Sequence, residues 1–488
     1  MDVKNVGSEV KLAGNGEFNV TSHSLASVIA SSGGKATVTN AYIGGACASL
    51  NSTITVSGNV TGNNIMGILT VYAQYNSTIT VSGNVTSTDG YGVYAQHNST
   101  VTVYGNVSVN VITNSLIASV GADNSNVTVY GEITLKVQGG ADMVSSGVSA
   151  KNCSFVEIKG NVTATRIDGI LNATDGVSAN SGSKVSVTGD VTGDRLGVGA
   201  SGSDTNVLIT GDLTGGSQGS VFAYDGAQVT VTGGVTEGNI DANSAKVSVT
   251  GDVTGTVSAY FNSATVIVTG DVTGSVITSE NATVTVTGDV IGGGVSSNGN
   301  NSIINVYGSV TCNNYGYAVR IFNGGVITIV GDVISDDRGV SFGGNSNAKS
   351  EVTIDGQITV KEPQAYGYIM IYYENHNYLA FSYTDYQPTS RKPGYLEYTD
   401  GTNYVWVKKT GTGMEIIPQP SSTLKAYIQN GHLHLSGLTV GDLWTVYNLS
   451  GAIAYQSRAT TKESDIYLST KGVYIIVSAG QRLKASNF

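Results

Sequence analysis

Three aspartates at near-regular intervals are the first residues whose type and spacing could do chemistry. Asp252, Asp271 and Asp289 each follow a glycine in three successive copies of one repeated phrase. Carboxylates stacked in neighbouring repeats would repel one another, and Ca²⁺ could relieve that repulsion because it binds oxygen ligands. Asparagine takes the same position in earlier repeats, so the alternative is that Asp is only a turn residue. The sequence leaves a calcium site and a simple turn both open.

Aromatic residues near the carboxy-terminal end form the second set. Residues 366–404 contain ten tyrosines. Tyr372, Tyr373, Tyr378 and Trp406 could form a platform on which sugar rings stack, provided that their own rings are exposed. The alternative is a β element that caps a repeat array, because an open end would expose apolar core and unpaired strand edges.

Catalysis on a glycan would need two carboxylates, or an acid and a base, on one outward face. GDRLG at 193–197 and SDDRG at 335–339 join acids to an arginine, but the two segments are far apart in the repeat array. Few ionisable residues are expected to point outward from the main strands: Glu157, Lys159, Lys184 and Glu351. The pattern favours a protein that is not an enzyme, and no cofactor other than Ca²⁺ is expected.

A repeated element must position these residues. VSVTGDVTG occurs at 185–193 and again at 247–255, and related phrases occur at 79–85, 229–235 and 284–292. A glycine that in most copies precedes Asp or Asn recurs every 18 to 29 residues, at positions 58, 83, 105, 131, 160, 189, 211, 233, 251, 270, 288, 308, 331 and 356. Gly14 and Asn40 fit the same alignment, which gives sixteen candidate turns. Self-similarity at this period indicates a solenoid.

Each repeat predicts short strands joined by corners. In STITVSG, Ile54 and Val56 point to one side, and Thr53 and Thr55 point to the other. The Gly-Asp or Gly-Asn pair is expected to break the strand because both residue types tolerate left-handed backbone angles. After this corner, each repeat continues with an inward valine and then with a second short strand of the pattern Val-x-Ala.

A second recurring residue supports the same register. An asparagine lies seven or eight residues before the aligned glycine in many repeats: Asn51, Asn76, Asn98, Asn124, Asn243, Asn262, Asn281 and Asn301. Stacked in neighbouring turns, such amides can hydrogen-bond to one another, so we predict an asparagine ladder along one corner.

Composition agrees with an all-β fold. The 488 residues include 65 Gly and only 5 Pro, with abundant Val, Thr, Ser and Asn, which are residues of strands and turns. We predict a parallel β-helix, or β-solenoid, of about 16 coils over residues 1–360. Uneven coil lengths and the usual hand of parallel crossovers favour a right-handed helix. A tyrosine-rich β capping element at 361–417 and a small C-terminal β-sandwich at 421–488 are expected to follow.

Two resemblances add to this interpretation. The repeat style of GVYAQHNSTVTVYGNV at 92–107 resembles the right-handed β-helices of bacterial surface adhesins and autotransporter-type passengers, over roughly residues 8–360. The segments LHLSGLTVGDLWTVYNLSG at 433–451 and GVYIIV at 472–477, followed by Lys484, resemble the C-terminal domains of secreted Bacteroidetes proteins in the style of the type IX sorting domain. The second resemblance implies export or surface attachment, and a leader peptide that the sequence lacks.

Charge and hydropathy limit the classes of partner that the protein could have. The net charge of −11 argues against a nucleic-acid partner, and no run of 18 apolar residues predicts a membrane span. The first hypothesis is a secreted or cell-surface adhesin or structural spacer, whose partner is a host or microbial surface glycan or protein. The alternative is a glycan-binding or glycan-cleaving β-helix, favoured if the loops at 107–117, 135–147 and 163–176 form a groove. Nothing in the sequence indicates an oligomeric state.

Overall fold

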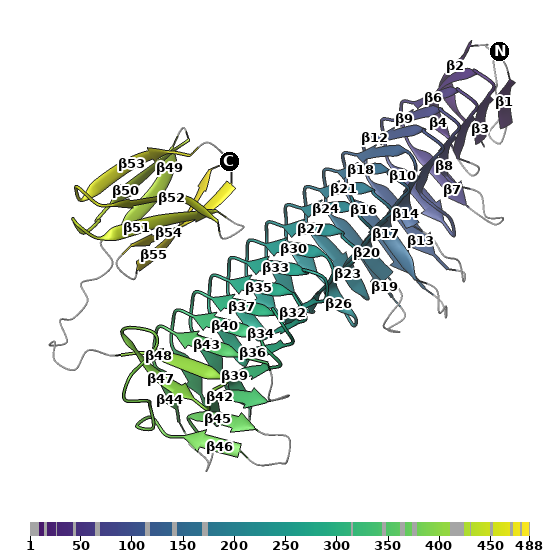
Figure 1. The fold of residues 1–488 in the computed structure, drawn as a ribbon. Helices are drawn as coiled ribbons and strands as arrows, with labels where there is room; N and C mark the ends of the chain where they lie inside the picture. Colours follow the sequence, from purple (N-terminus) through teal and green to yellow (C-terminus); the bar gives the residue numbers. More distant parts are fainter. Residues whose placement is uncertain are drawn as a thin grey trace. The chain divides into compact units, whose positions relative to one another are not determined.

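The computed structural model places most of the chain in short β-strands (Figure 1). It describes residues 9–13, 17–25, 27–41, 45–63, 69–112, 118–138, 144–167, 174–313, 316–343, 348–361, 367–372, 378–409, 424–429, 431–448, 452–468, 472–478 and 481–487. Two compact units divide the chain, Met1–Lys408 and Lys409–Phe488. In the described residues, no helix has the length and apolar character that crossing a membrane requires.

The first unit is a parallel β-solenoid whose strands stack in three columns. The first column contains the Val-x-Ala strands: β1 (Glu9–Ala13), β3 (Ser27–Ser31), β5 (Ala46–Ser49), β8 (Val71–Gln74), β11 (Val93–Gln96), β14 (Ala118–Asp123), β17 (Ser145–Lys151), β20 (Thr174–Asn180), β23 (Leu196–Ser201), β26 (Gly219–Tyr224), β29 (Ile240–Asn243), β32 (Val257–Tyr260), β39 (Tyr317–Phe322), β42 (Arg338–Gly343) and β45 (Ile369–Tyr372).

The second column contains the strands that precede the Gly-Asx corner, where Asx means Asp or Asn: β2 (Glu17–Leu25), β4 (Lys35–Ala41), β6 (Thr53–Val56), β9 (Thr78–Val81), β12 (Thr100–Val103), β15 (Asn126–Val129), β18 (Phe155–Ile158), β21 (Lys184–Val187), β24 (Asn206–Ile209), β27 (Gln228–Val231), β30 (Lys246–Val249), β33 (Thr265–Val268), β35 (Thr283–Val286), β37 (Ile303–Val306), β40 (Val326–Ile329) and β43 (Glu351–Ile354).

The third column contains the short strands after that corner: β7 (Val60–Asn63), β10 (Val85–Thr88), β13 (Val107–Val111), β16 (Ile133–Val137), β19 (Val162–Arg166), β22 (Val191–Gly193), β25 (Leu213–Thr214), β28 (Val235–Thr236), β31 (Val253–Thr254), β38 (Val310–Cys312), β41 (Val333–Ser335) and β44 (Ile358–Val360). Two longer strands, β34 (Val272–Ser279) and β36 (Val290–Asn298), run from the third column into the first column of the next coil.

The solenoid has about 14 turns from β6 to β43, with β2 and β4 stacked before them in the second column, so the count differs slightly from the 16 coils predicted. The first predicted turn was misassigned: Val10 and Leu12 lie in β1, which pairs with β3 in the first column, and residue 14 lies outside the described residues. A short apolar alternation has the same pattern in either column, so the sequence could not separate them. At about 4.8 Å for each coil, 14 turns span roughly 60 Å.

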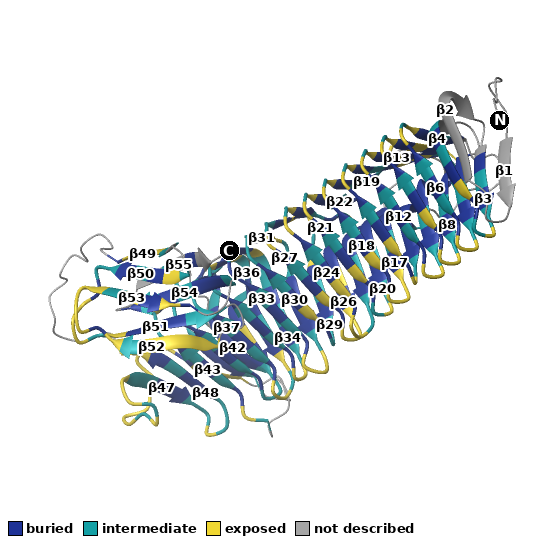
Figure 2. Ribbon diagram, turned by 90° about the horizontal axis from the view of Figure 1, so that it is seen from above, coloured by how far each residue is buried: buried dark blue, intermediate teal, exposed yellow. Residues whose placement is uncertain are grey.

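Inward and outward sides alternate as predicted along the second column. Ile54 and Val56 are fully buried, whereas Thr53 and Thr55 are half-buried on the outer face. The same alternation recurs from coil to coil, and Figure 2 shows it as buried positions alternating with more exposed ones along the strands. The interior is built from valine, alanine and isoleucine, and each fully buried valine contributes about 1.5–3 kcal/mol.

The Gly-Asx corner is required by close packing between coils, not by left-handed backbone angles. None of its described glycines or Asx residues has a positive φ, so the predicted reason for this corner was wrong. A Cβ added at Gly270 would lie 2.2 Å from Oδ1 of Asp252 and 2.6 Å from the carbonyl carbon of Gly251, both in the preceding coil. Positive φ values occur instead at the corner between the first and second columns, for example at Asn76 and Asn98. We call this the asparagine corner.

A column of buried serines, which the sequence analysis missed, joins the coils beside the asparagine corner. The backbone N–H of each serine donates to Oγ of the serine in the next coil at 3.0–3.2 Å, through Ser52, Ser77, Ser99, Ser125, Ser154 and Ser183. These hydroxyls satisfy backbone groups that would otherwise be buried without a partner.

The tyrosine-rich region folds back on the last coils. After β45, the chain forms β46 (Tyr378–Phe381), which is antiparallel to β45. β47 (Tyr395–Thr399) is antiparallel to β48 (Tyr404–Lys408), and β48 is parallel to β43. Tyr398 is buried, and its hydroxyl donates to the carbonyl of Tyr383 at 2.9 Å. These strands continue the sheet and cover apolar residues at the end of the stack.

The second unit contains two small antiparallel sheets around one core. β49 (Lys425–Gln429), β50 (His432–Ser436) and β53 (Glu463–Tyr467) form one sheet. The other has the order β52 (Ile453–Arg458), β51 (Leu443–Asn448), β54 (Gly472–Ser478) and β55 (Gln481–Asn487). Leu433, Trp444 and Ile476 are buried in the shared core, as expected for a β-sandwich.

The packing at the Gly-Asx corner predicts a sharp difference between two glycine substitutions. Gly270→Ala should lower the melting temperature strongly, because its Cβ would collide with the backbone of the preceding coil. Gly199→Ala is the matched control, since the atom nearest to its Cβ lies 3.7 Å away. Thermal unfolding followed by circular dichroism measures both. Equal stability of the two variants would contradict this account of the corner.

Candidate binding groove

The predicted calcium residues form a hydrogen-bonded ladder along the Gly-Asx corner. Oδ1 of Asp252 accepts the backbone N–H of Asp271 at 2.8 Å, and Oδ1 of Asp271 accepts that of Asp289 at 2.7 Å. Asparagine does the same in earlier coils, where Oδ1 of Asn84 accepts the N–H of Asn106 at 2.8 Å. One acceptor oxygen at this corner is therefore used by the next coil, whichever of the two residue types is present.

The described residues contain no group of three or more His, Cys, Asp or Glu side chains arranged to hold a metal ion. The spacing of the aspartates follows the coil spacing, and Ser309 takes the Asx position in the coil after Asp289. The backbone N–H of Ser309 donates to Oδ1 of Asp289 at 2.7 Å, and its Oγ accepts the N–H of Asp332 at 3.1 Å. The ladder gives the aspartates a role as turn residues that asparagine can also fill.

The structure brings together only part of the predicted aromatic platform. The rings of Tyr372 and Tyr378 have centroids 6.2 Å apart on β45 and β46, and Tyr378 is 45% exposed. Tyr372 also meets Tyr317 edge to face, with centroids 6.4 Å apart. Tyr373 lies outside the described residues. Trp406 lies on β48 in the second column, so the four residues do not share one strand column.

Other side chains of the cap cover the rings near Trp406. Tyr404 stacks on Trp406 with centroids 5.4 Å apart, and the guanidinium of Arg391 lies 4.5 Å from the centroid of Tyr404. Nε1 of Trp406 donates to the buried carboxylate of Glu397 at 3.0 Å. Lys392 lies over the Trp406 ring, at 5.8 Å. These contacts give Trp406 a role in holding the cap together.

The acid–arginine segments form ion pairs within the solenoid. Nη2 of Arg195 lies 2.5 Å from Oδ2 of Asp175, which is buried on β20. Burial raises the pKa of Asp175, and the hydrogen bond and charge of Arg195 oppose that rise. At the other segment, Asp337 pairs with Arg338 at 3.3 Å and Asp336 pairs with Lys361 at 2.9 Å. Asp175, Asp336 and Asp337 are thus each paired with a cation, and Oδ2 of Asp194 accepts the backbone N–H of Arg166.

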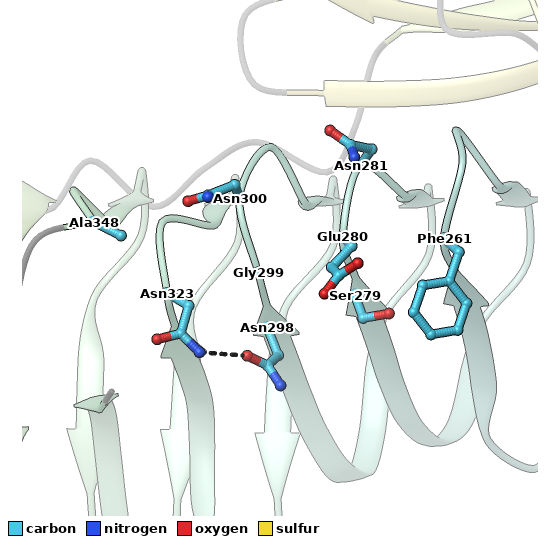
Figure 3. Close-up of a pocket in the computed structure, with 9 residues that line it drawn as sticks. All are labelled: Phe261, Ser279, Glu280, Asn281, Asn298, Gly299, Asn300, Asn323 and Ala348. Atoms are coloured by element: carbon cyan, nitrogen blue, oxygen red, sulfur yellow. Dashed lines mark hydrogen bonds between the residues drawn. The ribbon is translucent and has the colours of Figure 1, made fainter. Parts of the chain in front are cut away.

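A groove of about 820 Å³ lies along the asparagine corner in the carboxy-terminal half of the solenoid (Figure 3). Its walls come from five successive corners between the first and second columns. The described residues that line it are Phe261, Ser279, Glu280, Asn281, Asn298, Gly299, Asn300, Asn323 and Ala348. We call this set the corner groove. Figure 3 shows these residues following one another from coil to coil.

Hydrogen bonds between coils fix several amides of the corner groove. Nδ2 of Asn323 donates to Oδ1 of Asn298, and Nδ2 of Asn301 donates to Oδ1 of Asn281, both at 3.0 Å. The predicted asparagine ladder is thus confirmed between Asn301 and Asn281, and again between Asn98 and Asn76 at 2.8 Å. Nδ2 of Asn262 instead donates to Oγ of Ser244 at 3.2 Å. The amides are held in position before any ligand arrives.

Unused polar groups in the corner groove indicate that it can bind a polar ligand. Oγ of Ser279 is buried and has no hydrogen-bond partner among the described residues, which is costly unless a ligand or water supplies one. Each asparagine amide offers two N–H donors and an acceptor oxygen, more than one bond between coils uses. Phe261 presents an apolar ring, 43% exposed, at one end. Amides, a hydroxyl and an exposed ring suit a carbohydrate.

Sequence reasoning found the asparagines of this corner but not the groove. The asparagine column was interpreted as a ladder, and the extra residues Glu280, Asn298 and Asn300 stood outside the alignment. The signal that could have found the groove is the concentration of asparagine near 298–301, together with Phe261 at the same corner. The loops at 107–117, 135–147 and 163–176, where a groove was expected, include residues 113–117, 139–143 and 168–173 that lie outside the described residues.

The fold and the corner groove define the class of this chain as a β-solenoid repeat protein with small antiparallel sheets at its carboxy-terminal end. No known family model, characterised protein or solved structure matches it.

The Asx ladder predicts how Asp271 responds to substitution and to chelation. Asp271→Asn keeps an acceptor oxygen and should change the free energy of unfolding by less than about 0.5 kcal/mol. Asp271→Ala removes the acceptor for the N–H of Asp289 and should cost about 1 kcal/mol. Adding a chelator should leave the melting temperature unchanged. A drop on chelation that Asp271→Asn abolishes would instead establish calcium binding at Asp252, Asp271 and Asp289.

Proposed function

We propose that this protein is a non-enzymatic surface adhesin whose rigid solenoid binds carbohydrate in the corner groove. The observation that carries the proposal is the lining of the groove: amides held in register by bonds between coils, a buried hydroxyl without a partner, and an exposed aromatic ring. Such groups recognise hydroxyl-rich ligands, because each amide can donate and accept at once. The adhesin hypothesis and the glycan-binding alternative thus converge on one surface.

The charges of the groove favour binding over cleavage. Glu280 is the single ionisable side chain among its described lining residues. Glycosidases commonly use a pair of carboxyl groups that flank the scissile bond, one as acid and one as base or nucleophile. A lone carboxylate among amides supports recognition of a glycan without hydrolysis.

The stack itself supports a role as a spacer. Parallel strand pairing connects each coil to the next, and the Asx ladder and the serine column reinforce this pairing in parts of the stack. Each coil contacts chiefly its neighbours. A solenoid built in this way holds a groove at a fixed distance from its end. We propose that secretion or surface attachment depends on the C-terminal sandwich, on the basis of its resemblance to sorting domains.

Glycan binding is tested by a glycan array followed by calorimetry with the best ligand. Asn300→Ala and Phe261→Leu should each weaken binding about three- to tenfold, because each removes a hydrogen bond or a stacking surface. Asn110→Ala is the control for the amide, since Asn110 is exposed on β13 outside the groove. Phe155→Leu is the control for the ring, because Phe155 is also 43% exposed, on β18. Equal losses in the controls, or no bound glycan, would contradict the proposal.

The attachment hypothesis predicts a separable function for the second unit. A chain truncated after Lys408, the boundary between the compact units, should remain folded because the solenoid and its cap have their own core. It should no longer stay on the cell surface. Surface labelling of the full-length and truncated chains in the producing cells measures this, with circular dichroism as the check on folding. Undiminished surface display of a folded truncated chain would refute attachment through this unit.

A further inference from the structure

We infer that the ligand of the corner groove is a linear, uncharged polysaccharide that lies extended along the solenoid axis, with successive sugar residues on successive coils. This inference rests on the proposed carbohydrate function and specifies its ligand. It follows from the direction of the groove, from its repeat distance and from its charge.

The direction comes from the order of the lining residues. Phe261, Glu280, Asn300 and Asn323 belong to consecutive corners, each contributed by the coil after the last. Figure 3 shows these corners side by side, with Phe261 and Ala348 at the two ends. A ligand that fills the groove must therefore cross the coils, parallel to the axis of the stack, and a linear chain fits this path better than a compact ligand.

The repeat distance comes from the pairing of the strands. Neighbouring coils are separated by about 4.8 Å, so five corners span roughly 19 Å. One coil thus advances by close to the length of one pyranose residue in an extended glycan. Because the two repeats nearly match, a hydroxyl that meets an amide on one coil places the equivalent hydroxyl of the next sugar near an amide on the next coil.

Equivalent groups recur at this distance. Nδ2 of Asn301 donates to Oδ1 of Asn281 at 3.0 Å, which places these two amides at the same point of adjacent coils. The bond from Nδ2 of Asn323 to Oδ1 of Asn298 fixes two amides of the next pair of coils, where Asn298 is level with Phe322. Preorganised groups bind with less loss of side-chain entropy, so each coil can add affinity in a similar manner.

The ends and the charge of the groove narrow the ligand further. Phe261, at one end, can stack on the apolar face of a terminal sugar, and Ser279, in the neighbouring coil, has a buried hydroxyl that needs a partner. The described lining contains the carboxylate of Glu280 and no lysine or arginine. With a chain of net charge −11, an acidic polysaccharide would be repelled, so the ligand should be neutral.

A length series tests this inference. Calorimetry with the full chain would use neutral oligosaccharides of one to eight residues, cut from the glycan that binds best on the array. Each added residue should raise the affinity about three- to tenfold until about five residues fill the groove, after which affinity should stay constant. In the Phe261→Leu variant, the affinity should become constant at an oligosaccharide about one sugar residue shorter. The Phe155→Leu variant should show the same dependence on length as the parent protein.

The outcomes separate the inference from the proposed function. If no saccharide of any length binds, the proposed carbohydrate function fails. If saccharides bind but a monosaccharide binds as tightly as the pentasaccharide, the function stands and the extended ligand is refuted. A uronic-acid oligosaccharide of five residues should bind at least tenfold more weakly than the neutral one. Equal binding of the two would overturn the assignment of an uncharged ligand.

Discussion

Close contact between successive coils at the Gly-Asx corner is the constraint on which the solenoid depends. The N–H of Gly288 donates to the carbonyl of Gly270 at 3.2 Å, and the N–H of Asp289 donates to Oδ1 of Asp271 at 2.7 Å. The approach leaves no room for a Cβ on the glycine, and in most coils the next residue has a short side chain whose oxygen accepts from the following coil. Glu132 and Gly234 take that position in two coils. The repeated phrase of the sequence is therefore a packing requirement, met once in every coil.

The asparagine corner is under a looser constraint, and for this reason we propose it as the binding surface. Left-handed residues such as Asn281 and Asn301 turn the chain there, and the adjacent positions change from coil to coil without disturbing the ladder between the coils. Phe261 and Glu280 show how varied these positions are. One corner keeps the stack in register, and the other can acquire groups for a ligand.

Much of the fold could be predicted because the strand period is a local signal. The alternation of residues along a strand predicts the inward places of Ile54 and Val56. The repeat of 18 to 29 residues predicts the Asx column and the asparagine ladder. The reason for the glycine could not be found in this way, since it depends on the distance to another coil. The same holds for the corner groove: its residues lie about 20 residues apart in sequence, and their convergence depends on how the corners stack. The partners of Trp406 likewise become apparent only when β43 and β48 pair.

We propose that the Gly-Asx corner holds the stack together and that the asparagine corner binds a carbohydrate ligand. Amide hydrogen exchange of the full chain, with and without the best-binding oligosaccharide, tests both halves in one measurement. The account predicts slow exchange at the Gly-Asx corners, such as 270–272 and 288–290, in both states, and new protection on binding confined to 260–263, 279–282 and 298–302. Fast exchange at the Gly-Asx corners, or new protection centred on them rather than on the asparagine corner, would contradict it.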